Sequence, residues 1–254
     1  VIGREGKIDS MEKNWASAGA KFVVVYGSHK SGKTAVLSEF AKEKRGVFFS
    51  AERLNSFMNL RLFEKAVSEF SGEEEDFPTW KVAFKRIGEF AKDERFLLAI
   101  DDFADLVFED RTILKDFRNA FENEWRNSNI FVVAGCGRVF FTETEIVAEN
   151  SAASMRRPVI YKLEELDYLD SAKILPKEIS AKDKMRYYCC LGGVPEYLKL
   201  VDGGKTFEEN IRKIFLEKDS PLFGEPPMLF LDELRERLLV QERLCLLVEE
   251  CLVC

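Results

Sequence analysis

Eight consecutive residues near the start of the chain have the types and spacing of a phosphate-binding loop. They follow the apolar run 22–26 directly and are Gly27, Ser28, His29, Lys30, Ser31, Gly32, Lys33 and Thr34. In this GxxxxGK[ST] pattern the glycines let backbone N–H groups point at phosphate oxygens, and the helix that begins near Thr34 and Ala35 presents its positive end. We expect Lys33 to pair with the β- and γ-phosphates and Thr34 to bind Mg²⁺. The pattern predicts a site for a nucleoside triphosphate.

A second stretch places two carboxylates at the end of an apolar strand. Residues 96–100 are apolar, and Asp101 and Asp102 follow them. In a fold built around a phosphate loop, this strand end lies beside the metal ion. We expect Asp101 to hold Mg²⁺, directly or through water, and Asp102 to orient or deprotonate the attacking water. Together the two motifs indicate an enzyme that hydrolyses its nucleotide.

Three further positions have two interpretations each. Cys136 follows the apolar run 130–134, where a polar side chain could contact the γ-phosphate, but a thiol is a weak donor, which favours a structural turn over that contact. Arg156 could stabilise charge in the transition state, within the chain or across a subunit boundary, or be a surface arginine without a role. His29, the only histidine, is either a variable loop residue or a pH-sensitive group at the phosphates.

The elements that must position these groups alternate between strand and helix patterns, which predicts an α/β fold with a parallel sheet flanked by crossover helices. Strands are expected at 22–26, 46–50, 95–101, 129–134 and 158–163. Helices are expected at 34–44, 56–70, 78–92 and 112–126. From 166 to 218 the pattern changes to short helices, interrupted at 191–195, which indicates a helical lid. The segment 228–254 is helical in period and rich in Leu and Glu.

Composition restricts the class further. With 254 residues, the chain can bury one substantial core and a smaller module. Charged residues make up 33% and no uncharged apolar run is long enough to span a bilayer, so we expect a cytoplasmic protein. A net charge of −7 argues against direct DNA binding. The six cysteines are expected to be reduced thiols, and the Cys251 to Cys254 spacing to mark apolar helix positions rather than zinc ligands.

These motifs resemble the archaeal ATPases of the STAND branch of AAA+-like P-loop NTPases. The likeness extends from the opening Gly3-Arg4-Glu5, through 23–34 and 101–103, to the lid segment 191–198 and to 219–223. It implies ATP or ADP as the nucleotide, backbone contacts of Gly3 and Arg4 near the adenine, and packing of Pro195 against the base. The family more often has Glu where this chain has Asp102, and an Asp-Asp pair occurs in related ATPases.

The resemblance implies three parts. These are a nucleotide-binding domain at 1–165, a helical lid at 166–225, and the start of an incomplete winged-helix-like module at 226–254. The expected function is Mg²⁺-dependent binding and hydrolysis of ATP, coupled to lid position as a molecular switch, with a protein partner or self-association. The main alternative is a nucleotide-binding interaction scaffold with little or no hydrolysis. A small-molecule kinase is disfavoured because no acceptor-binding insert is recognisable.

Overall fold

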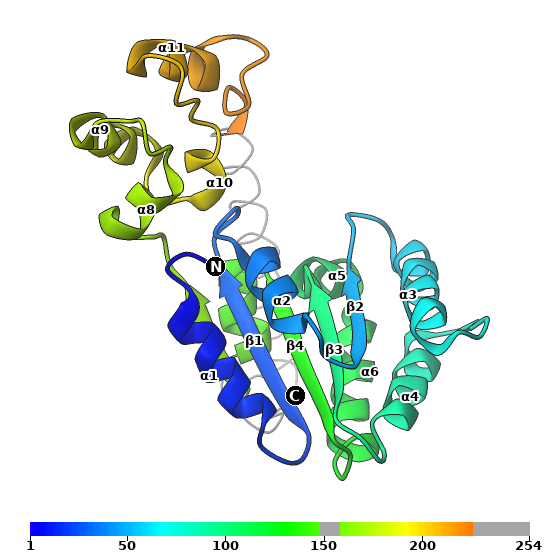
Figure 1. The fold of residues 1–254 in the computed structure, drawn as a ribbon. Coiled ribbons are helices and arrows are strands. Elements are labelled where there is room, and N and C mark those ends of the chain that lie inside the picture. Colours follow the sequence, from blue (N-terminus) through cyan, green and yellow to red (C-terminus); the bar gives the residue numbers. More distant parts are fainter. Residues whose placement is uncertain (148–157, 226–254) are drawn as a thin grey trace, which may run out of the picture. The chain divides into compact units, whose positions relative to one another are not determined.

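Five strands form one parallel sheet in a computed structural model that describes residues 1–147 and 158–225. They are β1 (Lys21–Gly27), β2 (Gly46–Ser50), β3 (Phe96–Asp101), β4 (Ile130–Cys136) and β5 (Val159–Leu163), in the order β2-β3-β4-β1-β5 (Figure 1). The predicted parallel sheet flanked by helices is confirmed. Because β4 lies between β1 and β3, the loop after β1 and the acidic pair after β3 face each other across the end of β4.

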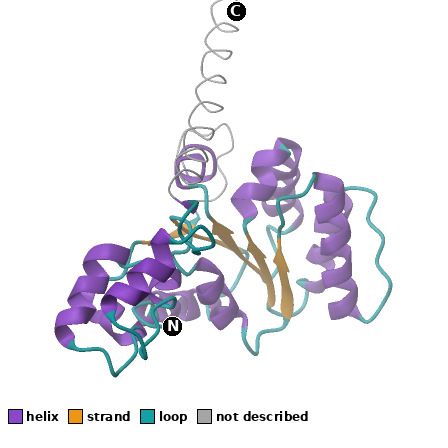
Figure 2. Ribbon diagram, turned by 90° about the horizontal axis from the view of Figure 1, so that it is seen from above, coloured by secondary structure: helices purple, strands orange, loops and turns teal. Residues whose placement is uncertain are grey.

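Helices cover both faces of this sheet, as Figures 1 and 2 show for the first part of the chain. The α-helices of this part are α1 (Glu5–Trp15), α2 (Lys33–Ala41), α3 (Ser56–Ser71), α4 (Trp80–Phe90), α5 (Phe103–Glu109), α6 (Arg111–Asn119) and α7 (Val139–Phe141). Two π-helical segments, η1 (Ala120–Glu124) and η2 (Thr142–Val147), continue α6 and α7. The sequence analysis did not predict α1 or α5, and the single helix expected at 112–126 changes from α to π at residue 120.

The alternation of side chains along the strands explains how the helices attach. Val23 and Val25 of β1 point to the face where α1 and α2 contribute Met11 and Phe40 to a buried cluster. Phe22, the strand position directly before Val23, points to the opposite face. There its ring lies 5.1 Å from that of Phe117 on α6 and 5.9 Å from that of Phe121 in η1. The three central strands, β1, β3 and β4, are therefore buried on both faces, as is typical of parallel sheets.

The chain divides into two compact units, one from Gly3 to Glu164 and the other beginning at Glu165. The described part of the second unit contains α8 (Tyr168–Ile174), α9 (Ala181–Leu191), α10 (Pro195–Leu198), α11 (Phe207–Ile211) and the π-helical η3 (Arg212–Leu216). Its own core includes Tyr187, Leu198 and Ile214. Asn210 is buried there and donates to the Tyr187 hydroxyl at 2.8 Å and to the Asp202 carbonyl at 2.9 Å.

Some of the sequence predictions concern residues outside the described ranges. The expected C-terminal module at 226–254 lies wholly outside the described residues, and so do Cys251 and Cys254. Within 1–147 and 158–225, no helix combines the length and apolar character needed to cross a membrane.

Phe117 offers a test of the core on the α6 face. Its buried ring contacts those of Phe22, Phe103 and Trp125, with centroids between 5.1 and 5.7 Å away. We expect Phe117→Ala to lower the free energy of unfolding by about 3–5 kcal/mol because it removes a ring and leaves a cavity. Urea denaturation followed by tryptophan fluorescence measures this unit, since all three tryptophans lie in it.

The matched control is Phe57→Ala, at a ring that is 60% exposed on α3. We expect it to cost less than about 1 kcal/mol. Equal losses for the two variants would contradict the packing described for this face.

Candidate functional site

The phosphate loop joins β1 to α2 through a left-handed turn. Gly32, at the N-cap of α2, has φ 91°, and Lys30 has φ 60°. A side chain at position 32 would be strained, because L-residues rarely adopt this backbone conformation. The turn leaves Ser28 and His29 exposed, buries Ser31, and exposes Thr34 and Ala35 on the first turn of α2.

Lys33 is the buried cation of the loop. Its ammonium donates to the carbonyl oxygens of Ser28 at 2.8 Å and Gly27 at 3.2 Å. Burial lowers the pKa of Lys33, and the nearby charges of Asp102 and Asp101 oppose that shift. The chain thus holds a desolvated positive charge between the loop and the acidic pair, where the sequence predicts the phosphates.

Asp101 lies at the end of β3, with only 1% of its surface exposed. Its Oδ1 accepts a hydrogen bond from the backbone N–H of Asp102 at 3.2 Å. A Cβ atom added at Gly135 of the neighbouring strand would lie 2.4 Å from this same oxygen, so β4 can pass only with glycine there. The carboxylate of Asp101 and the hydroxyl of Thr34 are the oxygen ligands that Mg²⁺ prefers, so the donor types fit the predicted metal.

Asp102 has an unusual backbone and an unusual charge environment. Its φ of 53° is left-handed, and it is the N-cap of α5. Burial, followed by the charges of Asp101 and Asp105, raises the pKa of Asp102 to about 6. Lys33 and Arg53 act in the opposite direction. A carboxylate with a pKa this close to neutrality is suited to accept a proton from water.

The segment that follows β4 lies beside both Lys33 and Asp102. A Cβ atom added at Gly137 would lie 3.8 Å from Lys33 Nζ and 3.8 Å from Asp102 Oδ1. The next residue, Arg138, donates from Nε to Asp105 Oδ1 at 2.9 Å. The sequence analysis gave Arg138 no role, although a basic residue two positions beyond the strand end was a usable signal.

Cys136 has no exposed surface. Burial raises the pKa of its thiol to about 12, so the group stays neutral and inside the fold. This placement favours the structural interpretation of Cys136 over a contact with the γ-phosphate.

Arg4 connects the start of the chain to the loop. Its guanidinium is 5% exposed and donates to the carbonyl of Ser31 at 3.3 Å and to that of Glu164 beyond β5. The side chain therefore links the phosphate loop to the segment that follows β5. Gly3, with φ 69°, forms the turn before it, and the expected backbone contacts of both residues with adenine stay a prediction.

Two predicted site residues do not belong to the described part of the first unit. Arg156 lies outside the described residues. Pro195 belongs to the second unit, where it is the first residue of α10 and follows Gly193, whose N–H donates to Glu165 Oε2 at 3.3 Å.

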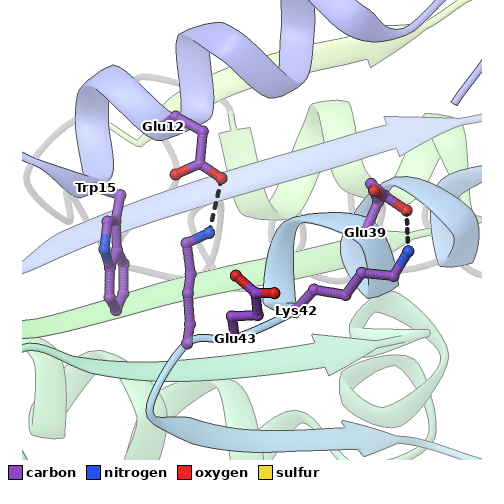
Figure 3. Close-up of a pocket in the computed structure, with 6 residues that line it drawn as sticks. Glu12, Trp15, Glu39, Lys42 and Glu43 are labelled. Atoms are coloured by element: carbon purple, nitrogen blue, oxygen red, sulfur yellow. Dashed lines mark hydrogen bonds and ion pairs between the residues drawn. The ribbon is translucent and has the colours of Figure 1, made fainter.

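A separate hollow of about 490 Å³ is lined by Glu12, Trp15, Glu39, Lys42, Glu43 and Lys44 (Figure 3). It lies at the C-terminal ends of α1 and α2, whereas the phosphate loop lies at the start of α2. Lys44 pairs there with Glu12 at 2.7 Å, and Lys42 with Glu39 at 2.6 Å. These pairs satisfy its charged groups locally, and the hollow takes no part in the site.

The pKa of Asp102 predicts how stability depends on pH. The unfolded carboxyl ionises near pH 4 and the folded one near pH 6, so the folded state is destabilised as pH rises through this window and remains so above it. We expect Asp102→Asn, which tolerates the left-handed backbone, to stabilise the protein at pH 8 by on the order of 1 kcal/mol, allowing for solvent screening. The gain should vanish near pH 4.

Urea midpoints at pH 8 and pH 4 measure this difference. A gain of the same size at both pH values would contradict the ionisation argument, because it would assign the effect to packing or backbone strain.

The comparisons with known proteins agree with the fold. A structure of a Walker-type ATPase from Pyrococcus abyssi has a TM-score of 0.66 at 16% identity, covering 93% of this chain and 76% of that one. The Aeropyrum pernix ORC2 protein in ADPNP–ADP complexes has a TM-score of 0.58 at 13% identity, covering 79% of this chain and 61% of that one. Cdc6p from Pyrobaculum aerophilum has a TM-score of 0.56 at 13% identity, covering 78% and 59%. At these identities the likeness concerns the fold.

The sequence relatives identify the family. An uncharacterised protein of Methanocaldococcus jannaschii is 20% identical over 203 residues, which are 79% of this chain but 44% of that protein. The chain thus spans less than half the length of this relative. A family model described as an ATPase domain predominantly from Archaea matches residues 2–201. The chain belongs to this family of archaeal ATPase domains.

Proposed function

We propose that this chain binds ATP together with Mg²⁺, hydrolyses it slowly, and couples its nucleotide state to the position of the second unit. The observation that carries the proposal is the buried Lys33 ammonium, held between the carbonyls of the phosphate loop and the carboxylates at the end of β3. Membership of the ATPase family and the P-loop fold support it.

Lys33 supplies the positive charge for the phosphates. In the structure its Nζ occupies the loop by donating to two backbone carbonyls, which are neutral acceptors. Phosphate oxygens are charged acceptors and form roughly twice as strong a hydrogen bond. Binding a triphosphate therefore exchanges weak contacts of the ammonium for strong ones. Mg²⁺, held by Asp101 and the Thr34 hydroxyl, would neutralise charge on the phosphates.

Asp102 is the residue proposed to act on the attacking water. It lies one position beyond Asp101, within reach of the segment that also borders Lys33. Its raised pKa keeps it basic enough to accept a proton near neutral pH. Asp is about one C–C bond shorter than the Glu that the resemblance leads one to expect, and a misplacement of about an ångström can cost on the order of 10²-fold in rate. This is the reason for proposing slow turnover.

The second unit is proposed to act as the lid. Pro195, at the start of α10, is the residue proposed to pack against the base. Two residues before it, the backbone of Gly193 is held in place, because Leu166 donates its N–H to the Gly193 carbonyl at 2.9 Å and Gly193 donates its N–H to Glu165. Exchange of ATP for ADP would then move α8 to α11 together as one rigid unit. A protein partner or a second copy of the chain would bind according to this change in lid position.

The second candidate is a nucleotide-binding scaffold that does not turn over. The left-handed backbone and the short side chain of Asp102 favour it, since both restrict how far the carboxylate can reach. The two candidates share the binding site and differ only in the fate of the γ-phosphate.

Turnover of Asp102 variants separates them. We expect Asp102→Asn to lower the rate of phosphate release by about 10²-fold or more, while ATP affinity measured by calorimetry changes by less than about threefold, because the lost interaction forms mainly in the transition state. Asp102→Glu should retain turnover or increase it, because it extends the carboxylate. Asp93→Asn, in the exposed turn before β3, is the control.

Magnesium-dependent phosphate release that is unchanged in both Asp102 variants would exclude Asp102 as the catalytic carboxylate. Absence of any release by the wild-type chain, with ATP still bound, would favour the scaffold.

A further inference from the structure

Four exposed apolar side chains gather at the neighbouring ends of α3 and α4. They are Leu54, Phe57, Met58 and Val82, here called the apolar patch, and their exposed fractions lie between 37% and 60%. We propose that the apolar patch is a docking site for an acidic amphipathic helix of a partner protein. The inference goes beyond the proposed function, because it concerns a protein contact made by residues outside the nucleotide site.

One hydrogen bond brings the two parts of the apolar patch together. The Trp80 indole N–H donates to the Ser56 hydroxyl at 3.2 Å, so the first turns of α3 and α4 lie side by side. Every member of the patch lies within two residues of one of these two side chains. The four apolar side chains therefore belong to one region of the surface.

The grouping of these side chains is specific to this place. Among the described residues of Gly3–Glu164, six large apolar side chains are exposed, and four of them form the apolar patch. The other two, Phe48 and Ile160, lie on the two outer strands of the sheet. Single exposed apolar residues are normal on a protein surface, whereas a group of them in one place is typical of an interaction site.

Arg61 holds the largest side chain of the apolar patch. Its guanidinium carbon lies 5.0 Å from the centre of the Phe57 ring. The same guanidinium is paired with Glu64 and Asp76, each at 2.7 Å, and these two ion pairs keep it against the ring. A ring that is fixed before binding loses little conformational entropy when a partner covers it.

Asn59 fixes the loop that carries Leu54. Its side chain is buried, and its amide donates to the carbonyls of Glu52 and Leu54, both at 3.0 Å. Its amide oxygen also accepts from the backbone N–H of Glu52 at 2.9 Å. Asn55 caps α3 by accepting from the N–H of Met58 at 2.9 Å. The apolar patch is therefore a preorganised surface.

Two lysines of α4 give the apolar patch a positive border. Lys81 precedes Val82, and Lys85 lies three residues after it, on the same face of the helix. Both lysines are exposed, and neither forms an ion pair with a residue in the described part of the chain. Their ammonium groups complement a partner that carries Glu or Asp beside its apolar residues, and they repel a basic one.

The elements that carry the apolar patch select the form of its partner. All four side chains come from the first turns of α3 and α4 or from the loop before α3, so these residues offer no strand edge to which a partner could add a strand. An amphipathic helix presents apolar residues along one stripe and charged residues on its flanks. With acidic flanks, such a helix matches both the apolar patch and its lysines.

Binding of two designed peptides to the full chain tests the inference. Both peptides are about 20 residues long and have leucines at the same helical spacing, but one carries Glu and the other Lys at the remaining positions. We expect fluorescence anisotropy to give the acidic peptide a Kd of about 10–100 μM. The basic peptide should bind at least about tenfold more weakly, because the lysine border repels it.

Variants of the full chain assign this binding to the apolar patch. We expect Phe57→Ala to weaken binding of the acidic peptide by about tenfold or more, since it removes the aromatic anchor. The combined changes Lys81→Glu and Lys85→Glu should reverse the preference, so that the basic peptide binds more tightly than the acidic one. The matched control is Leu169→Ala on α8, at an apolar side chain that is 70% exposed, and it should change neither affinity.

Four outcomes would overturn the inference. They are absence of binding by the acidic peptide, equal binding of the two peptides, binding that Phe57→Ala leaves unchanged, and an equal loss in Leu169→Ala. Self-association of the wild-type chain that is lost in Phe57→Ala would assign the apolar patch to a second copy, and duplex DNA binding lost in that variant would assign it to nucleic acid. Either result would contradict a partner helix. All these measurements are made without nucleotide, so their outcome is independent of the proposed function.

Discussion

The site depends on one buried positive charge. The Lys33 ammonium is desolvated, which lowers its pKa, and is held in place by two loop carbonyls and by the field of Asp101 and Asp102. Burying a charge is costly unless it is paired and hydrogen-bonded, and here the partners come from the loop itself and from the end of β3. Under the proposed function, phosphate oxygens replace the two loop carbonyls as acceptors of this ammonium.

The order of the strands makes this arrangement possible. Since β4 lies between β1 and β3, its carboxyl end passes both Lys33 and the acidic pair. It does so without side chains at Gly135 and Gly137, where added Cβ atoms would meet Asp101 at 2.4 Å and approach Lys33 and Asp102 within 3.8 Å. The left-handed backbone of Asp102 then turns the chain sharply from β3 into α5. Such strain is typical of functional sites, where the surrounding structure enforces it.

Sequence reasoning captured the parts that depend on local pattern. The loop and the strands carry strong signals, because the loop needs fixed residue types and the three central strands, β1, β3 and β4, are buried on both faces. It missed α5, a seven-residue helix too short to show a helical period, and with it the link from Asp105 to Arg138. The contact of Arg4 with the Glu164 carbonyl spans 160 positions and leaves no trace in either local sequence. The contacts of the lid with the base stay predictions.

The most direct measurement of the central claim is ATP affinity in Lys33→Ala, determined by calorimetry with Mg²⁺ present. Lys42→Ala, at the other end of α2 and in an exposed ion pair with Glu39, is the matched control. The account predicts that ATP binding weakens by more than about 10²-fold in the first variant, since a charge-assisted contact to the phosphates is removed, and stays within about twofold of wild type in the second. Unchanged ATP affinity in Lys33→Ala would contradict the account, because the buried ammonium would then have no part in holding the nucleotide.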